Sequence, residues 1–214
     1  MQKIISMLVL FFPLVLCAQA GLSLGKGILK IDINKLPVLF FYSDTIQNTG
    51  LKTIEIIRAA NGELSIKNAS ESGGWFKPEQ LFFEYDIFML RVENNTGNWL
   101  RVYTDNEKGI TMWTKTDVSQ RFIEWPKFLL KEVSAVDKNP SFELDIKASP
   151  DESSKTIKKI EATDCFEVLE IKGEWMHIKT NLKAECNESK KVIKSGWIKW
   201  KLNNKLAISY SLMA

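Results

Sequence analysis

The sequence predicts an all-β protein made of two consecutive units of short antiparallel strands. Its apolar runs are short, rich in β-branched and aromatic residues, and separated by clusters of Asn, Gly, Asp and Ser. The apolar spacing typical of helices is almost absent. In addition, a Trp-bearing pattern at Gly97–Thr104 and Met112–Lys115 returns at Gly173–Thr180 and Gly196–Lys199. We therefore expect the same structural unit twice.

Residues 1–20 have the features of a secretory signal peptide. Lys3 precedes an apolar run from Ile4 to Leu16, and small residues occupy positions 18 and 20. The run is shorter than the roughly 20 residues that span a bilayer, which leaves a membrane anchor as the alternative. We do not expect a lipoprotein anchored at Cys17, because Leu16 stands where that processing prefers a small residue. The protein is predicted to be secreted or periplasmic after cleavage near Ala20.

The charge balance gives little pull toward nucleic acid. The chain has 29 Lys and Arg against 26 Asp and Glu, and the predicted signal removes only one basic residue. Nucleic-acid binding domains normally carry a clustered basic face instead. No later stretch is apolar and long enough to predict a membrane span. We therefore expect neither nucleic acid as a partner nor a membrane span in the mature chain.

The first unit is predicted to cover residues 21–134. Strands are expected at 37–42, 52–57, 85–92, 99–104 and 110–115, with hairpin loops rich in Asn and Gly at 93–98 and 104–109. Residues 68–83 are an irregular insertion that has no counterpart in the later unit. Residues 135–141, which contain Pro140, are predicted to be the linker.

The second unit is predicted to cover residues 142–214, with strands at 155–160, 165–171, 175–180, 194–200 and 205–212. Its motifs occur in the order opening strand, middle strand, Trp hairpin and Gly-Trp-Ile strand. They are Leu144, Ile146, Lys147 and Pro150; Phe166, Val168 and Leu169; Gly173 and Trp175; and Gly196, Trp197 and Ile198.

This order resembles the bacterial Src-homology-3 (SH3) family. The first unit matches more weakly, through Gly97, Trp99, Val102 and Trp113, so that Trp99 corresponds to Trp175 and Trp113 to Trp197. The resemblance implies two small SH3-like barrels in tandem. It also implies ligands such as cell-wall peptides or short protein segments, held in aromatic-lined grooves. The turn at 181–194 is longer than the family pattern.

Alternation along the strands assigns candidate binding residues. In 99–104 it places Leu100, Val102 and Thr104 toward the core, and in 175–180 it places Met176 and Ile178 there. The outer faces then pair aromatic with cationic side chains, which suits a ligand groove. The alternative is that each Trp covers the core of its own barrel. The candidate ligand-binding residues are Trp99, Arg101, Tyr103, Trp113, Trp175, His177, Lys179 and Trp197.

The sequence predicts no catalytic site. His177 is the one His of the chain, and the acidic residues have neither metal-ligand spacing nor the pattern of a catalytic pair, so neither a metal nor a cofactor is expected. Cys165 and Cys186 would both reach an oxidising compartment, where a disulfide is favoured, with two free thiols as the alternative.

Two functions follow as hypotheses. The first is a non-catalytic extracytoplasmic binding module for cell-wall peptide or short protein segments. The second is an envelope interaction or structural protein that docks onto another secreted protein through the extended turn near Cys186.

Overall fold

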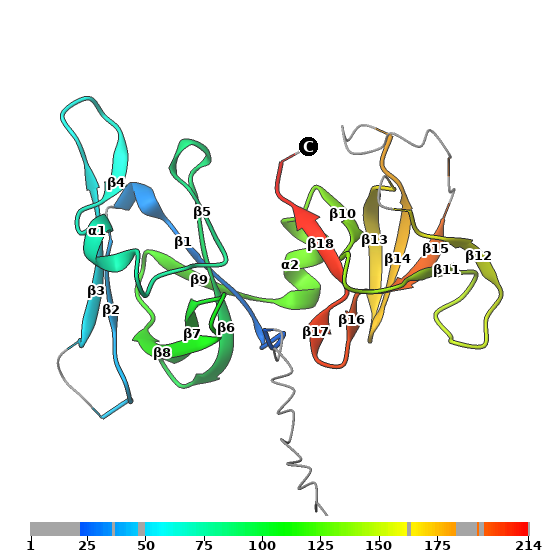
Figure 1. Cartoon of the computed structure of the whole chain (residues 1–214), viewed down its shortest axis with the longest axis horizontal. Helices are drawn as coiled ribbons and strands as arrows, with labels where there is room; N and C mark the ends of the chain where they lie inside the picture. The colour runs from blue at the N-terminus through cyan, green and yellow to red at the C-terminus, as the bar shows by residue number, and fades with distance from the viewer. Residues whose placement is uncertain are drawn as a thin grey trace, which may run out of the picture.

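The computed structural model describes residues 22–35, 37–46, 50–161, 164–182, 192 and 195–213. Antiparallel sheets dominate it, as Figure 1 shows, and the predicted all-β class is confirmed. The predicted signal peptide lies outside the described residues.

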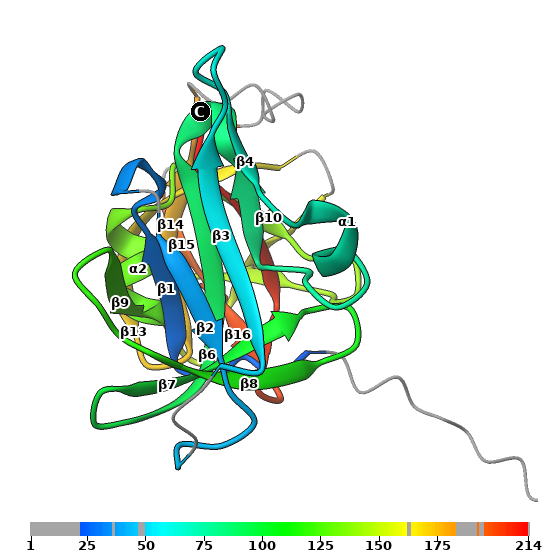
Figure 2. The same ribbon diagram turned by 90° about the vertical axis from the view of Figure 1, so that its left-hand side faces the viewer.

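The first unit contains a six-stranded sheet and a three-stranded sheet. The six-stranded sheet consists, in spatial order, of β8 (Ile110–Lys115), β7 (Trp99–Asp105), β6 (Ile87–Thr96), β1 (Gly27–Ile31) and β9 (Gln120–Glu124), with β5 (Gln80–Phe82) also beside β6. The three-stranded sheet consists of β2 (Val38–Phe41), β3 (Lys52–Arg58) and β4 (Leu64–Ile66). Figures 1 and 2 show this smaller sheet on the side turned away from the second unit.

The second unit contains a seven-stranded sheet and a small hairpin. The sheet consists, in spatial order, of β12 (Thr156–Lys159), β11 (Asp145–Lys147), β15 (Gly196–Lys199), β14 (Trp175–Thr180), β13 (Phe166–Lys172), β10 (Ala135–Lys138) and β18 (Ile208–Ser211). The hairpin is β16 (Lys201–Leu202) with β17 (Lys205–Leu206). The helical segments of the described chain are η1 (Ile33–Lys35), α1 (Ala69–Ser72), η2 (Phe83–Tyr85) and α2 (Trp125–Lys131).

The two units share one topology. The order β8-β7-β6-β1-β9 of the first unit corresponds to β15-β14-β13-β10-β18 of the second. The β2–β3 hairpin lies beside β8, because an isolated bridge joins Tyr42 to Trp113. In the second unit β11 and β12 have the same place beside β15, where Lys147 pairs with Trp197. Even an irregularity recurs, because the register shifts at the same point of both Trp hairpins, after Val92 and after Val168.

The expected barrels are not closed. In the described parts of the chain the hydrogen-bonded strand order has two ends in each unit, and no pairing joins them. Both units are therefore bent, open sheets, and the prediction holds at the level of class and duplicated strand order.

The predicted linker is wrong for its first four residues. Ala135–Lys138 forms β10, which pairs with β13 and β18 inside the second sheet. This strand is the counterpart of β1, so it opens the second unit. Ala135 and Val136 are buried, which explains why this segment is a strand although the polar residues around it indicated a spacer.

A continuous core joins the two units. One apolar cluster contains Ile28 and Met89 from the first sheet together with Val136, Phe166 and Ile208 from the second. Helix α2, which lies between the sheets in Figure 1, supplies the contact through the buried side chains Trp125, Phe128 and Leu129. The remaining apolar residues of the first unit pack between its own two sheets. The two units are therefore packed against each other rather than connected only by the chain.

A polar network also crosses the contact between the units. Glu79 accepts hydrogen bonds from Arg91 Nε at 2.9 Å and Nη2 at 2.8 Å, and from the hydroxyl of Tyr210 at 2.8 Å. Asn106 Nδ2 donates a further bond of 2.7 Å to it. Burial, and then the charge of Glu79, raise the pKa of Tyr210 far above its ordinary value. Tyr210 therefore stays a neutral donor that ties β18 to the first unit.

Candidate functional site

The two Trp hairpins are equivalent in register. Trp99 faces Lys115 across β7 and β8, and Trp175 faces Lys199 across β14 and β15. In the same way, Trp113 stands opposite Arg101 and Trp197 opposite His177. Gly97 and Gly173 both adopt positive φ angles, of 56° and 61°, in the turns before the Trp residues. The register thus agrees with the correspondence that the sequence predicts.

In the first unit, Trp99 has an aromatic and a cationic neighbour from the same chain. The ring of Tyr42 meets the Trp99 ring edge-on with centroids 5.1 Å apart, and Lys115 Nζ lies 4.8 Å above the same ring. Arg101 pairs with Glu93 at 3.0 Å. The Tyr42 ring thus links the end of β2 to β7, and the Trp99 side chain is half-buried, as Trp175 is in the second unit. Trp113 is half-buried beside them.

Tyr103 does not belong to the predicted outward face. Its side chain is only 4% exposed. Burial raises its pKa, and a hydrogen bond with Ser23 acts in the opposite direction. The segment around Ser23 covers this part of β7, so both faces of the strand are buried here. Tyr103 is therefore a structural residue, while the predicted inward residues Leu100, Val102 and Thr104 are indeed buried.

In the second unit, Trp175 lines an open hollow of about 340 Å³. We call this hollow the Trp175 groove; its lining is Glu143, Leu144, Asp145, Lys147, Glu152, Lys159, Trp175, Lys199 and Leu202. Lys199 Nζ lies 5.4 Å from the centre of the Trp175 ring and also pairs with Glu152. The groove therefore combines an aromatic surface with three ammonium and three carboxylate groups.

The charges of the Trp175 groove differ in how fully they are paired. Lys147 donates a 3.0 Å hydrogen bond to Thr156 and lies 4.0 Å from Asp145. Lys159 is exposed, and no carboxylate of the described chain pairs with it. Glu143 is 84% exposed and lies 3.6 Å from Lys138. Lys159 and Glu143 are thus the cation and the anion most free to meet a ligand.

The remaining predicted residues of the second unit share the outer face but do not line this groove. His177 stacks on Trp197, with ring centroids 4.6 Å apart and planes 12° from parallel. Lys179 pairs with Glu167 at 3.1 Å. Met176 and Ile178 face the core as predicted. His177 and Trp197 therefore form an aromatic pair of their own, on the same face of the sheet as Trp175.

Two predictions involve residues outside the described ranges. Cys165 is buried beside Ala135, whereas Cys186 and most of the extended turn lie outside the described residues. The disulfide between Cys165 and Cys186 stays a prediction, and so does docking through that turn.

The sequence indicates no role for Trp75, Trp125 and Trp200. Trp75 packs, partly buried, against Phe41 and Phe76. Trp200 is buried and donates to the carbonyl of Gly173 at 3.0 Å, which holds the turn before Trp175. Trp125 donates to the carbonyl of Leu24 at 2.7 Å. A signal for Trp125 existed, because Pro126 follows it and Phe128 and Leu129 continue a helical spacing.

The described residues provide neither a cluster of metal ligands nor a helix that could cross a membrane. They contain no group of three or more His, Cys, Asp or Glu side chains placed to hold a metal ion. Over the same ranges, no helix has the length and apolar character required to cross a bilayer.

Comparisons with known proteins place the chain in no family. No protein-family profile matches it, and no curated protein matches it. Among solved structures, it is similar to NlpC2 from Trichomonas vaginalis, with a TM-score of 0.32 and 11% sequence identity. The matched region covers 88% of this chain and 49% of that one, so the chain spans about half the length of that protein. At this TM-score the likeness carries no argument about fold or function.

Proposed function

We propose that the protein is a non-catalytic extracytoplasmic binding module that recognises short peptides in the Trp175 groove. The observation that carries the proposal is the place of Trp175 in a hollow, beside paired and unpaired charges of both signs. A flat aromatic ring supplies contact area at a low cost in conformational entropy, and neighbouring charges fix the orientation of the ligand.

The composition of the groove indicates the kind of peptide. Lys159 is free to pair with a carboxylate, and the exposed Glu143 is free to pair with an amine. A ligand with both groups, and with an apolar part to cover the Trp175 ring, fits this arrangement. Cell-wall peptides carry amine and carboxylate groups along a short chain. The resemblance to bacterial SH3 domains supports the same ligand class.

The equivalent face of the first unit supports this proposal by contrast. Its Trp99 ring packs against the Tyr42 ring, whereas none of the described aromatic rings packs against Trp175, which has the same register. We therefore assign ligand binding to the second unit and a structural role to the first Trp hairpin.

Co-sedimentation of the protein, without residues 1–20, with purified cell-wall sacculi tests the proposal. We expect the wild type to sediment, and Trp175→Ala to lose about five-fold or more in affinity, since stacking on one ring contributes on the order of 1 kcal/mol or more. Trp99→Ala is the matched control, and it should sediment like the wild type. Circular dichroism of both variants verifies folding.

Three outcomes would speak against this function. Equal losses for Trp99→Ala and Trp175→Ala would place the site elsewhere. A folded Trp175→Ala that sediments normally would remove the groove from the proposal. A wild type that never sediments, but captures a single envelope protein, would favour docking through the extended turn.

A further inference from the structure

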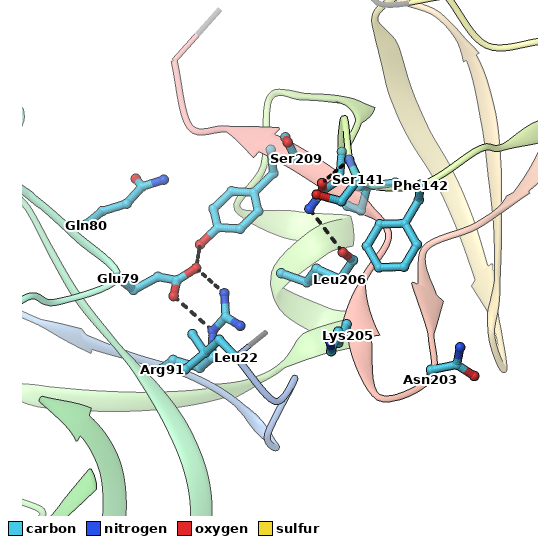
Figure 3. A pocket seen from close by; sticks show the side chains of 13 residues that line it. Leu22, Glu79, Gln80, Arg91, Ser141, Phe142, Asn203, Lys205, Leu206 and Ser209 are labelled. Carbon is cyan, nitrogen blue, oxygen red and sulfur yellow. Dashed lines mark hydrogen bonds and ion pairs between the residues drawn. The ribbon is translucent and has the colours of Figure 1, made fainter. Parts of the chain in front are cut away.

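A larger cavity lies between the two units, separate from the Trp175 groove. It has a volume of about 740 Å³, which is within the size range of small-molecule sites. Figure 3 shows its lining from both sides, with Glu79 and Arg91 opposite Phe142 and Leu206. We call it the inter-unit cavity; its lining is Leu22, Glu79, Gln80, Arg91, Asn139, Ser141, Phe142, Asn203, Lys205, Leu206, Ile208, Ser209 and Tyr210. No single unit could form it, because both contribute walls.

The one carboxylate in this lining has no capacity left for a ligand. Glu79 receives two bonds from Arg91, one from Tyr210 and one from Asn106. A carboxylate offers about four acceptor positions, so all of them are filled. Arg91 also balances its charge, at a separation of 2.8 Å. The Glu79–Arg91 pair is thus a neutral, saturated wall.

The cation that remains is Lys205. It lines the cavity from β17, half-buried, and none of the described carboxylates pairs with it. The amides of Gln80 and Asn203 also line the cavity, and in the described structure neither side chain makes a hydrogen bond. Figure 3 shows Lys205 between Arg91 and Asn203 at the lower edge of the group. Among the described residues of the lining, the free polar groups therefore include one ammonium, two amides and the hydroxyl of Ser141.

The lining also has an apolar part. Phe142 and Leu206 form the second-unit wall, and Leu22 lies on the opposite side. An ammonium without a partner in a partly apolar hollow favours an anion, because the surroundings screen the charge less than bulk water does.

We propose that the inter-unit cavity binds a small carboxylate ligand with an apolar body and an amide group, and that Lys205 pairs with its carboxylate. The apolar body contacts Phe142, and the amide of the ligand bonds to Gln80 or Asn203. This site does not rest on the proposed function of the Trp175 groove, since it uses none of the same residues. Because the cavity exists only when the units are packed together, such a ligand also stabilises their contact.

Matched probes test the site in the whole chain without residues 1–20. N-acetylphenylalanine carries the carboxylate, the amide and an apolar ring, while N-acetylphenylalaninamide differs only in lacking the charge. We expect the acid to bind and to raise the melting temperature. We expect the neutral amide to bind at least about ten-fold more weakly, as measured by calorimetry. Hexanoate has the carboxylate and an apolar chain but lacks the amide. Binding of hexanoate as strong as that of the acid would indicate a simple carboxylic acid as the natural ligand, and weaker binding would indicate a peptide carboxyl terminus.

Substitutions make the test specific. Lys205→Met should abolish the preference for the acid over the amide. Lys201→Met is the control, because Lys201 lies in the same hairpin but faces Glu174 and the Trp200 ring. Trp175→Ala should leave binding of the acid unchanged. Equal binding of acid and amide, an unchanged preference in Lys205→Met, or no binding of the acid at millimolar concentration would each overturn the proposal.

Discussion

Replacing Arg91 with Met should destabilise the protein by about 3 to 5 kcal/mol, which is the cost of leaving one partner of a buried ion pair uncompensated. The Arg91 and Glu79 side chains are only 10% and 8% exposed. Without Arg91, the carboxylate of Glu79 keeps only Tyr210 and Asn106 as donors. The variant also loses the guanidinium that lies 5.4 Å from the Trp125 ring.

A second Arg–Glu pair in the same unit provides the control. Arg101 and Glu93 are bonded at a similar distance of 3.0 Å, but their side chains are 46% and 32% exposed. Solvent screens such a pair, so Arg101→Met should cost no more than about 1 kcal/mol. Because both variants remove an Arg from an Arg–Glu pair, the difference between their losses in stability reports the effect of burial.

Equilibrium unfolding in urea, followed by far-ultraviolet circular dichroism and Trp fluorescence, measures both variants. The double variant Glu79→Leu with Arg91→Met should recover much of the loss, because no charge is then left buried. If Arg91→Met unfolds within about 1 kcal/mol of the wild type, as the exposed control should, the network does not stabilise the contact between the units.

Three further predictions concern single residues. The hydrogen bond from Lys30 holds the pKa of Glu132 below its usual value, against the opposing effect of burial. The stabilisation by Glu132 is therefore present above about pH 4.5 and lost as the pH falls through the lowered pKa, and Lys30→Met should flatten this acid limb in urea titrations from about pH 3 to pH 6. Gly27→Ala places a Cβ 2.1 Å from the carbonyl oxygen of the strand beside it, so its urea midpoint should reveal a loss of about 1 to 3 kcal/mol, while Gly74→Ala, with nothing within 4 Å, should be neutral. If the predicted disulfide forms, Cys165→Ser should cost about 3 kcal/mol in unfolding without reductant, and a peptide map that finds Cys165 unbridged would contradict it.

Alternation along strands predicted side-chain faces well wherever one face of the strand meets solvent. Met176 and Ile178 point inward as expected, since β14 is covered on one side only. Tyr103 was misplaced because the other side of its strand is covered by a segment around Ser23, about 80 residues away in the chain. Such coverage depends on tertiary contacts, which periodicity within one strand does not report.

The Trp hairpins and the repeat could be predicted from local patterns, but the spatial order of the strands and the contact between the units could not. Glu79 reads as one more polar residue of an irregular insertion, and Arg91 and Tyr210 stand in ordinary strand patterns. Their association joins positions far apart in the sequence, and it exists only because the two sheets pack together. The Trp175 groove was predicted as an aromatic surface, whereas its acidic rim, which comes from Glu143 and Glu152, was not.

The insertion distinguishes the two copies of one topology. Glu79 and Gln80 lie within residues 68–83, which the second unit lacks, and they contact Tyr210 and the inter-unit cavity. The first unit thus gained a segment that holds its partner in place. In its own Trp hairpin, Trp99 packs against Tyr42. Because the second unit is held by its β10 and β18 side, its Trp175 groove, which is formed by β11, β14 and β15 with the neighbouring loops, stays open to solvent. This arrangement is consistent with the proposed function, in which the second unit binds the ligand and the insertion of the first unit holds the two units together.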